Sequence, residues 1–453
     1  MLVWALTKRN RAASRRTVDL RLRGRASLRS LPLFVLYVGI AAVGQPGPMP
    51  TGDEAPLLSF SARLLDGHYA APGTMDSVAY LWHGPGTPLL LTPFVALDVP
   101  LSVLRFVGPV LLFAAALAFH QLLRPRVGPR GALVGTYAFG LYLPFYEGLP
   151  TLHKEPLAVL LVTAGLLWTS RLLLGGHRRH IALAGLALGA LAMVRLEYGW
   201  LTIALLTASA MWWLLATDRG PARRMVCVCA VALATCAPWL IYTYDLTGHA
   251  LYWGNSGGSS LYWMSPTGGR IETGQWHAEH SVFKDPTLSR YRGLFTRLHR
   301  LAPAQRDQAL RRAAAGNVRA RPVLYLRNLA ANVVRLWFLE PFRPRPPTVP
   351  VIAYLAVNSL FLAAVGWAAV LLARRRPGLP RETLPFATFA AGALVIHVIP
   401  SAEPRMALPA VPALLWLVVY AANRAFVERA ASGRGEPRLS AVGATAVTSA
   451  TPV

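Results

Sequence analysis

The chain consists of long apolar runs separated by short polar connections. Apolar stretches lie at about 31–44, 100–123, 131–149, 156–174, 181–199, 200–216, 225–243, 350–373, 384–400 and 406–423. Most of them approach the roughly 20 residues that an α-helix needs to cross the apolar core of a bilayer. The pattern predicts an all-α polytopic membrane protein with about ten transmembrane helices. The first run could also be a signal-peptide core, but its long basic leader and the many later spans favour an uncleaved helix.

Arginine clusters occupy alternate short loops between these runs. The clusters are Arg124, Arg126 and Arg130, then Arg171, Arg178 and Arg179, then Arg219, Arg223 and Arg224, and finally Arg374, Arg375, Arg376 and Arg381. The opposite short connections, around 150–155, 199 and 401–404, carry little positive charge. Because cytoplasmic loops are enriched in Arg and Lys, this alternation predicts a protein of the cell (plasma) membrane with both termini cytoplasmic.

This topology divides the chain into three parts. A basic cytoplasmic tail is expected at 1–29, a membrane domain at 30–425 and a disordered cytoplasmic tail at 426–453. Two long connections then lie outside the cell: a first outer loop at 46–99 and a long outer segment at 245–349, after the seventh span. The outer segment is also rich in arginine, but long loops are translocated largely regardless of charge. Extracytoplasmic amphipathic helices are expected in both connections.

Composition supports a membrane protein and argues against a nucleic-acid partner. Of the 453 residues, 54% are hydrophobic and only 15% are charged, whereas soluble domains carry nearer a quarter charged residues. The net charge of +26 comes from arginines placed between apolar runs, which indicates topology signals and contacts with anionic membrane lipids rather than DNA or RNA. The three cysteines (Cys227, Cys229 and Cys236) lie in one apolar run and are interpreted as packing residues.

The first outer loop opens with an acidic pair, Asp53 and Glu54. The apolar residues that follow, at 57, 58, 60, 64 and 65, have the spacing of a short amphipathic helix on the membrane surface. Acidic residues at the start of a helix are stabilised by the helix dipole, which is the structural interpretation of the pair. The functional interpretation is a general base at the boundary between water and lipid.

Further polar residues are expected on the same outer side. They are His83 in a Gly- and Pro-rich turn, Lys154 and Glu155 at the start of the fourth span, Arg195 near Glu197, Asn255 and Tyr262 in a glycine- and aromatic-rich loop, and Glu403 with Arg405 before the last span. The structural alternatives are a rigid turn, interfacial anchors and a flexible loop with an aromatic belt. The functional alternative is a shared cavity for a polar ligand, with Arg405 as a fork for a phosphate.

Taken in order, these motifs resemble the C-type glycosyltransferases that use polyprenyl-phosphate sugars, in particular the protein-mannosyltransferase and aminoarabinose-transferase relatives. An Asp-Glu pair soon after the first span is typical of that family and is matched here by Asp53 and Glu54. Also matched are the Pro-rich turn into Leu-Leu at 83–91, the acidic-Pro step at Glu155-Pro156, Pro238-Trp239 with the loop at 255–262, and the closing Glu403, Arg405 and Pro409. The resemblance covers roughly residues 31 to 425.

The resemblance implies a hexosyl- or pentosyltransferase that moves a sugar from a polyprenyl-phosphate donor to a cell-envelope glycan, lipid or protein on the outer face. It implies catalytic residues at Asp53 and Glu54, with Asp53 as the base, and a donor-phosphate site at Arg405, with Arg195 as second candidate. His83, Lys154, Glu155, Asn255, Tyr262 and Glu403 are the implied substrate-binding residues. No cofactor is certain, but a divalent metal ion could bind at Glu54 or His83.

Two other classes of function remain open from the sequence. A transporter or flippase for a polyprenyl-linked glycan would have the same spans, although its polar groups are expected near the bilayer midplane. A non-catalytic scaffold subunit of cell-envelope assembly is the third interpretation, because Ala55-Pro56 stands where the family usually has an aromatic residue.

Overall fold

The computed structural model describes residues 28–69, 81–267, 274–338, 349–374, 379–401 and 403–432, and these residues form helices and loops without a β-strand. Six helical segments are long and apolar enough to cross a membrane: Leu101–Gly140, Glu155–Leu173, Glu197–Leu215, Arg219–Thr247, Val351–Arg374 and Pro404–Ala430. Shorter apolar helices lie at Leu28–Gly44, Gly86–Ala96, Arg179–Val194 and Thr383–Val398. The predicted all-α polytopic membrane fold is confirmed.

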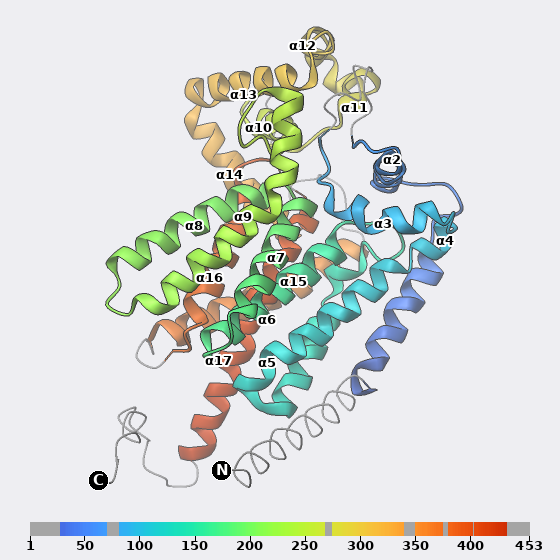
Figure 1. Ribbon diagram of the computed structural model, residues 1–453. Coiled ribbons are helices and arrows are strands. Elements are labelled where there is room, and N and C mark those ends of the chain that lie inside the picture. The colour runs from blue at the N-terminus through green and yellow to red at the C-terminus, as the bar shows by residue number, and fades with distance from the viewer. Residues whose placement is uncertain are drawn as a thin grey trace.

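The bundle is built from the helix Leu28–Gly44 and eight labelled helices (Figure 1). These are α5 (Val107–Gly140), α6 (Glu155–Leu173), α7 (Arg179–Val194), α8 (Glu197–Leu215), α9 (Arg219–Thr247), α15 (Val349–Arg374), α16 (Thr383–Val398) and α17 (Val411–Ser432). Helix α17 extends to Ser432, which lies within the tail predicted at 426–453. Residues 1–27 and 433–453, which make up most of the two predicted tails, lie outside the described residues.

Helix α5 contains two of the expected spans, joined at a sharp kink. Gly128 has a φ of 69°, a left-handed conformation that glycine adopts at little cost, and Pro129 follows it directly. The kink lies in the basic connection predicted between the second and third spans. The third span is shorter than predicted, because α5 ends at Gly140 and a 3-10 turn, η1 (Leu143–Tyr146), follows. Pro144 has no backbone N–H to continue the helical bonding.

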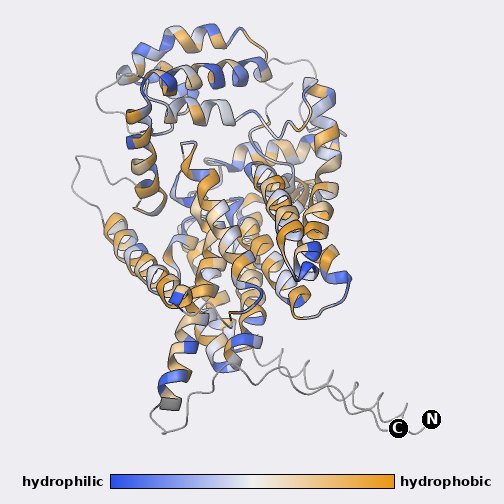
Figure 2. Cartoon of the chain, turned by 90° about the vertical axis from the view of Figure 1, so that its left-hand side faces the viewer, coloured by the Kyte–Doolittle hydropathy of each residue, from blue (hydrophilic) through white to orange (hydrophobic). Residues whose placement is uncertain are grey.

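Close helix packing in the bundle depends on small residues. Helix α7 packs against α6 and α9. A Cβ atom at Gly185 would lie 2.5 Å from the Val231 side chain, and one at Gly189 would lie 2.6 Å from the carbonyl oxygen of Ala232. The two glycines therefore allow α7 and α9 to approach closely. Figure 2 shows that most residues of the bundle are hydrophobic.

One end of the bundle carries short helices instead of spans. Helices α2 (Glu54–Leu65), α3 (Gly86–Ala96) and α4 (Leu101–Leu104) lie there, together with α10 (Gly257–Met264), α11 (Glu279–Lys284), η2 (Pro286–Tyr291), α12 (Arg292–Leu298), α13 (Pro303–Ala320) and α14 (Pro322–Phe338) (Figure 1). We call α10 to α14 the cap. Its own small apolar core includes Tyr262, Trp263 and Phe295. The helices expected in the two long connections are thus present.

Candidate functional site

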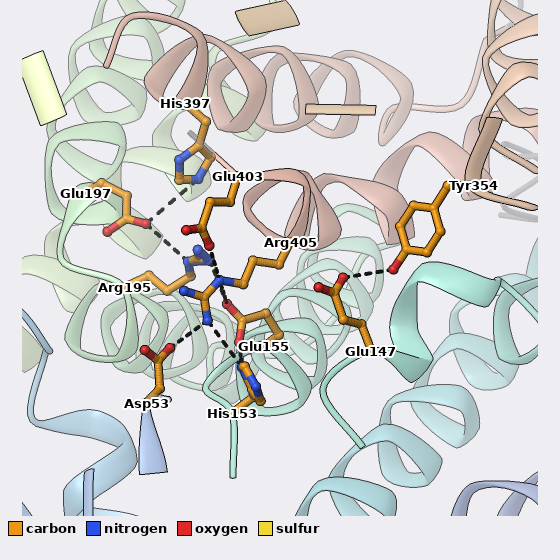
Figure 3. Close-up of polar contacts among 10 residues, drawn as sticks. All are labelled: Asp53, Glu147, His153, Glu155, Arg195, Glu197, Tyr354, His397, Glu403 and Arg405. Atoms are coloured by element: carbon orange, nitrogen blue, oxygen red, sulfur yellow. Dashed lines mark hydrogen bonds and ion pairs between the residues drawn. The ribbon is translucent and has the colours of Figure 1, made fainter. Parts of the chain in front are cut away.

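Ionisable side chains from five parts of the fold meet at the end of the bundle that carries α2 and the cap (Figure 3). Each comes from the end of a helix rather than from its middle. The contributors are Asp53 before α2, His153, Lys154 and Glu155 at the start of α6, Arg195 and Glu197 between α7 and α8, His397 at the end of α16, and Glu403 and Arg405 at the start of η3 (Pro404–Ala410). We call this group the charge cluster.

The Arg405 guanidinium is the centre of the charge cluster. Its Nη1 donates to Asp53 Oδ2 at 2.6 Å, and its Nε donates to Glu403 Oε2 at 2.7 Å. The same Nε lies 4.0 Å from Glu155 Oε1. The side chains of Arg405 and Asp53 are 23% and 20% exposed, so solvent or a ligand can reach this pair.

A second arginine continues the charge cluster toward the bundle. The Arg195 side chain is fully buried; its Nη1 lies 3.5 Å from Glu155 Oε1, and its Nε donates to Glu197 Oε1 at 3.1 Å. His397 Nε2 lies 3.8 Å from the same Glu197 oxygen. The bend between α7 and α8 places Arg195 here, because its backbone is extended (φ −130°, ψ 99°) between two helices. Carboxylates and cations thus alternate from Asp53 to Glu197, and this pairing offsets the cost of burying them.

The close packing of opposite charges shifts the pKa values of several residues in the charge cluster. Burial alone would raise the pKa of Asp53, but the positive charges of Arg405 and Lys154 outweigh it and hold that pKa below its ordinary value. Burial, together with the Arg195 charge, lowers the pKa of Lys154. Burial would also lower the pKa of His153, but its hydrogen bond and its attraction to Glu155 raise that pKa overall. Asp53 is therefore an ionised carboxylate at neutral pH.

The neighbouring residue, Glu54, belongs to a different ion pair. Its carboxylate accepts two bonds from Arg105, both at 2.8 Å, and backbone N–H bonds from Thr51 and Leu152, both at 2.9 Å. The Glu54 side chain has no exposed surface. Burial alone would raise its pKa, but these hydrogen bonds lower the pKa to about 2. Glu54 therefore ties the start of α2 to Arg105 and to the segment before α6, and it has no free oxygen facing the charge cluster.

His83 lies beside the charge cluster, in the turn that leads into α3. Burial, followed by the charge of Lys154, lowers its pKa to about 3, so its ring is neutral. Its carbonyl oxygen accepts a bond of 2.7 Å from the Tyr69 hydroxyl. A Cβ atom at Gly84 would lie 1.9 Å from the carbonyl oxygen of Met193. This glycine thus lets the turn press against the end of α7, two residues before Arg195.

Asn255 and Tyr262 make contacts with neighbouring segments of the protein. Asn255 Oδ1 accepts a bond of 3.1 Å from the backbone N–H of Leu81. The Tyr262 ring packs edge-on against Trp263 and Phe295 in the cap core. The glycines between them also face protein, since a Cβ atom at Gly258 would lie 2.2 Å from the carbonyl oxygen of Asp307. Most of the loop at 255–262 thus belongs to helix α10 of the cap.

Sequence reasoning missed Arg105 and His397 and gave no site role to His153 and Glu197. Arg105 and His397 both lie within apolar runs, and an ionisable residue in such a run is expensive to bury unless it has a partner. That signal could have singled them out.

A small cavity of about 20 Å³ lies next to Arg405 and is lined in part by Glu147. The Glu147 carboxylate accepts a hydrogen bond of 2.8 Å from the Tyr354 hydroxyl.

The residues considered for a divalent metal do not form a metal site. Within the described ranges, no group of three or more His, Cys, Asp or Glu side chains is arranged to hold a metal ion. At Glu54 the reason is geometric, because Arg105 and two backbone N–H groups occupy its oxygens.

Comparison with known proteins gives a similarity of fold. No family model and no curated protein matches the sequence. Among solved structures, the chain is similar to the archaeal oligosaccharyltransferase AglB from Archaeoglobus fulgidus, solved in complex with an inhibitory peptide and a dolichol-phosphate, with a TM-score of 0.50 and 13% identity. The match covers 93% of this chain and 52% of that one, so this chain spans about half the length of its structural neighbour. The fold is thus similar to that of this archaeal oligosaccharyltransferase.

Proposed function

We propose that this protein transfers a sugar from a polyprenyl-phosphate-linked donor to an acceptor, at the end of the bundle that carries the cap. The observation that carries the proposal is the partly exposed pair of Asp53 and Arg405, which joins a carboxylate and a guanidinium where apolar helices end. The similarity in fold to an oligosaccharyltransferase solved with dolichol-phosphate supports the same class of donor.

Arg405 is the proposed group for the donor phosphate. Negative charge builds on the polyprenyl phosphate as the bond to the sugar breaks, and a preorganised cation lowers the energy of that transition state. Arg405 is partly exposed and held from one side by Glu403, whereas Arg195 is fully buried between two carboxylates. We therefore assign the phosphate to Arg405 and give Arg195 the task of positioning Glu155 and Glu197.

Asp53 is the proposed base. An acceptor hydroxyl oxygen attacks the anomeric carbon, the carbon–oxygen bond to the phosphate breaks, and its electron pair leaves with the polyprenyl phosphate. The acceptor proton passes to Asp53. His83 and Lys154 lie close enough to contribute electrostatically to Asp53 and are proposed to face the bound sugar.

The acceptor is proposed to be a cell-envelope glycan, lipid or protein outside the cell. Alternating arginine-rich loops support this orientation, with both chain ends cytoplasmic and the charge cluster extracytoplasmic. The position of the charges also argues against a transporter, because they lie at helix ends rather than at the middle of the spans. The protein-mannosyltransferase-like motifs favour a hexose or pentose as the transferred sugar.

The test is release of polyprenyl phosphate by purified protein in sealed liposomes, with polyprenyl-phosphate sugars carrying a radiolabel in the polyprenyl chain. We expect acceptor-dependent release by the native protein and a loss of about 10²- to 10⁴-fold in Asp53→Asn, the range for removing a general base. Asp66→Asn, an exposed acid at the other end of α2, is the matched control and should keep native activity. Native-like release by Asp53→Asn would exclude Asp53 as the base, and movement of an intact donor across the bilayer without release would indicate a flippase.

A further inference from the structure

The proposed base and the proposed phosphate ligand are bonded to each other. Asp53 and Arg405 are 352 residues apart in sequence, yet their side chains form one of the shortest ion pairs in the charge cluster, at 2.6 Å. A carboxylate in this arrangement occupies an N–H group that a phosphate would need. The two proposed functions therefore compete for the same atoms.

The geometry of the guanidinium shows which partner a phosphate would replace. A phosphate that binds an arginine in bidentate fashion uses two neighbouring nitrogens. It therefore takes either the pair Nη1 and Nη2 or the pair Nε and Nη2. In Arg405, Nη1 is bonded to Asp53 and also lies 3.3 Å from His153 Nδ1, and Nε is bonded to Glu403. Glu403 lies two residues away on the same segment, so it remains beside Arg405 when the segment moves. Asp53 belongs to a separate element and is the partner that can leave.

The surroundings of Asp53 let its side chain turn without unfolding α2. Asp53 precedes the first residue of α2, but its side chain makes no capping hydrogen bond to that helix. The backbone at this point is fixed by the next residue, since Glu54 is held by Arg105 and by the N–H of Leu152. A rotation of the Asp53 side chain therefore breaks its contact with Arg405 and leaves the anchor at Glu54 in place.

We propose that the Asp53–Arg405 pair is the resting state of the site, and that the phosphate of the donor replaces Asp53 on Arg405 and so releases it to act as the base. This inference rests on the proposed function. In the resting state Asp53 is a weak base, because Arg405 stabilises its ionised form. Once a phosphate takes the Nη1 edge, Asp53 loses that stabilisation and gains a negative neighbour, and both changes raise its affinity for a proton. The acceptor is then deprotonated only when a donor is bound.

The test is equilibrium binding of polyprenyl phosphate to the full chain in nanodiscs, with the uncharged polyprenol of the same length as reference. If phosphate replaces Asp53 on Arg405, Asp53→Asn should bind polyprenyl phosphate about tenfold more tightly than the native protein, equivalent to about 1.4 kcal/mol. The reason is that the phosphate no longer has to displace a carboxylate from Arg405. Polyprenol affinity should not change. Arg405→Ala should lose the preference for phosphate over alcohol.

Glu403→Gln separates exchange from a general change in charge. This variant also removes one negative charge from Arg405, at 2.7 Å, but from the partner that is expected to stay. Exchange predicts a clearly larger gain in Asp53→Asn than in Glu403→Gln. Equal gains in the two variants, or no gain in Asp53→Asn, would overturn the inference while leaving the donor assignment intact. If the native protein binds polyprenyl phosphate no better than polyprenol and Arg405→Ala changes nothing, the proposed function fails as well.

Discussion

Two ion pairs begin at adjacent residues, Asp53 and Glu54, and differ in nearly every physical respect. The Glu54–Arg105 pair has almost no exposed surface; Glu54 Oε1 accepts two hydrogen bonds and Oε2 accepts three. The Asp53–Arg405 pair is about one-fifth exposed on each side. A saturated, buried pair can only hold the fold together, whereas a partly exposed pair can exchange a partner. The comparison separates an anchor from a reactive site within one dipeptide.

The largest expected effect comes from breaking the anchor. Arg105→Met leaves the Glu54 carboxylate buried without its cation, and removing one partner of a buried ion pair costs about 3–5 kcal/mol. We expect a lower thermal unfolding midpoint for the protein in detergent, together with a smaller amount of folded protein in the membrane. Asp53→Asn, whose pair is partly exposed, should unfold close to the native midpoint. Equal loss of stability in the two variants would contradict the distinction between anchor and reactive site.

A smaller effect is expected from titrating the same anchor. The pKa of folded Glu54 is about 2, below its ordinary value of 4.5, so its ionised form stabilises the fold. That contribution is complete above about pH 4.5 and is lost as pH falls through the folded pKa. We therefore expect the difference in unfolding stability between the native protein and Glu54→Gln to be constant from pH 7 to about pH 5 and to shrink below it. A difference that grows on acidification would show that Glu54 is protonated in the fold.

Hydropathy and charge predicted most of the fold. Helices occur where the apolar runs predicted them, and the basic connection between the second and third spans is the kink at Gly128. The length of the third span was not predictable from hydropathy alone, because residues 141–149 are as apolar as a span but contain Pro144. A proline interrupts backbone bonding without lowering hydropathy.

The candidate site was predictable in part. The sequence indicated that Asp53, Glu155 and Arg405 lie on one side, because each stands near the predicted outer end of an apolar run, and the structure brings the three together. It did not show that Glu54 is held in a separate buried ion pair, since that pair depends on Arg105, a residue 51 positions away from Glu54. Nor did it show that Tyr262 is part of the cap core, because aromatic residues in a loop look alike whether they stack on a sugar or on one another.

The smallest expected effect comes from changing the shape of the Arg405 side chain while keeping its positive charge. Arg405→Lys keeps the positive charge but replaces a planar fork by a single ammonium, which cannot hold Glu403 and a phosphate in the same fixed arrangement. We expect the KM for the polyprenyl-phosphate donor to rise about tenfold, a loss of about 1.4 kcal/mol of binding, with a smaller change in kcat. Arg424→Lys, on α17 beside Glu428, removes a fork from a surface ion pair and should leave KM unchanged. An unchanged KM in Arg405→Lys would mean that a positive charge alone is enough at this position. The planar guanidinium would then not be needed for the phosphate to replace Asp53.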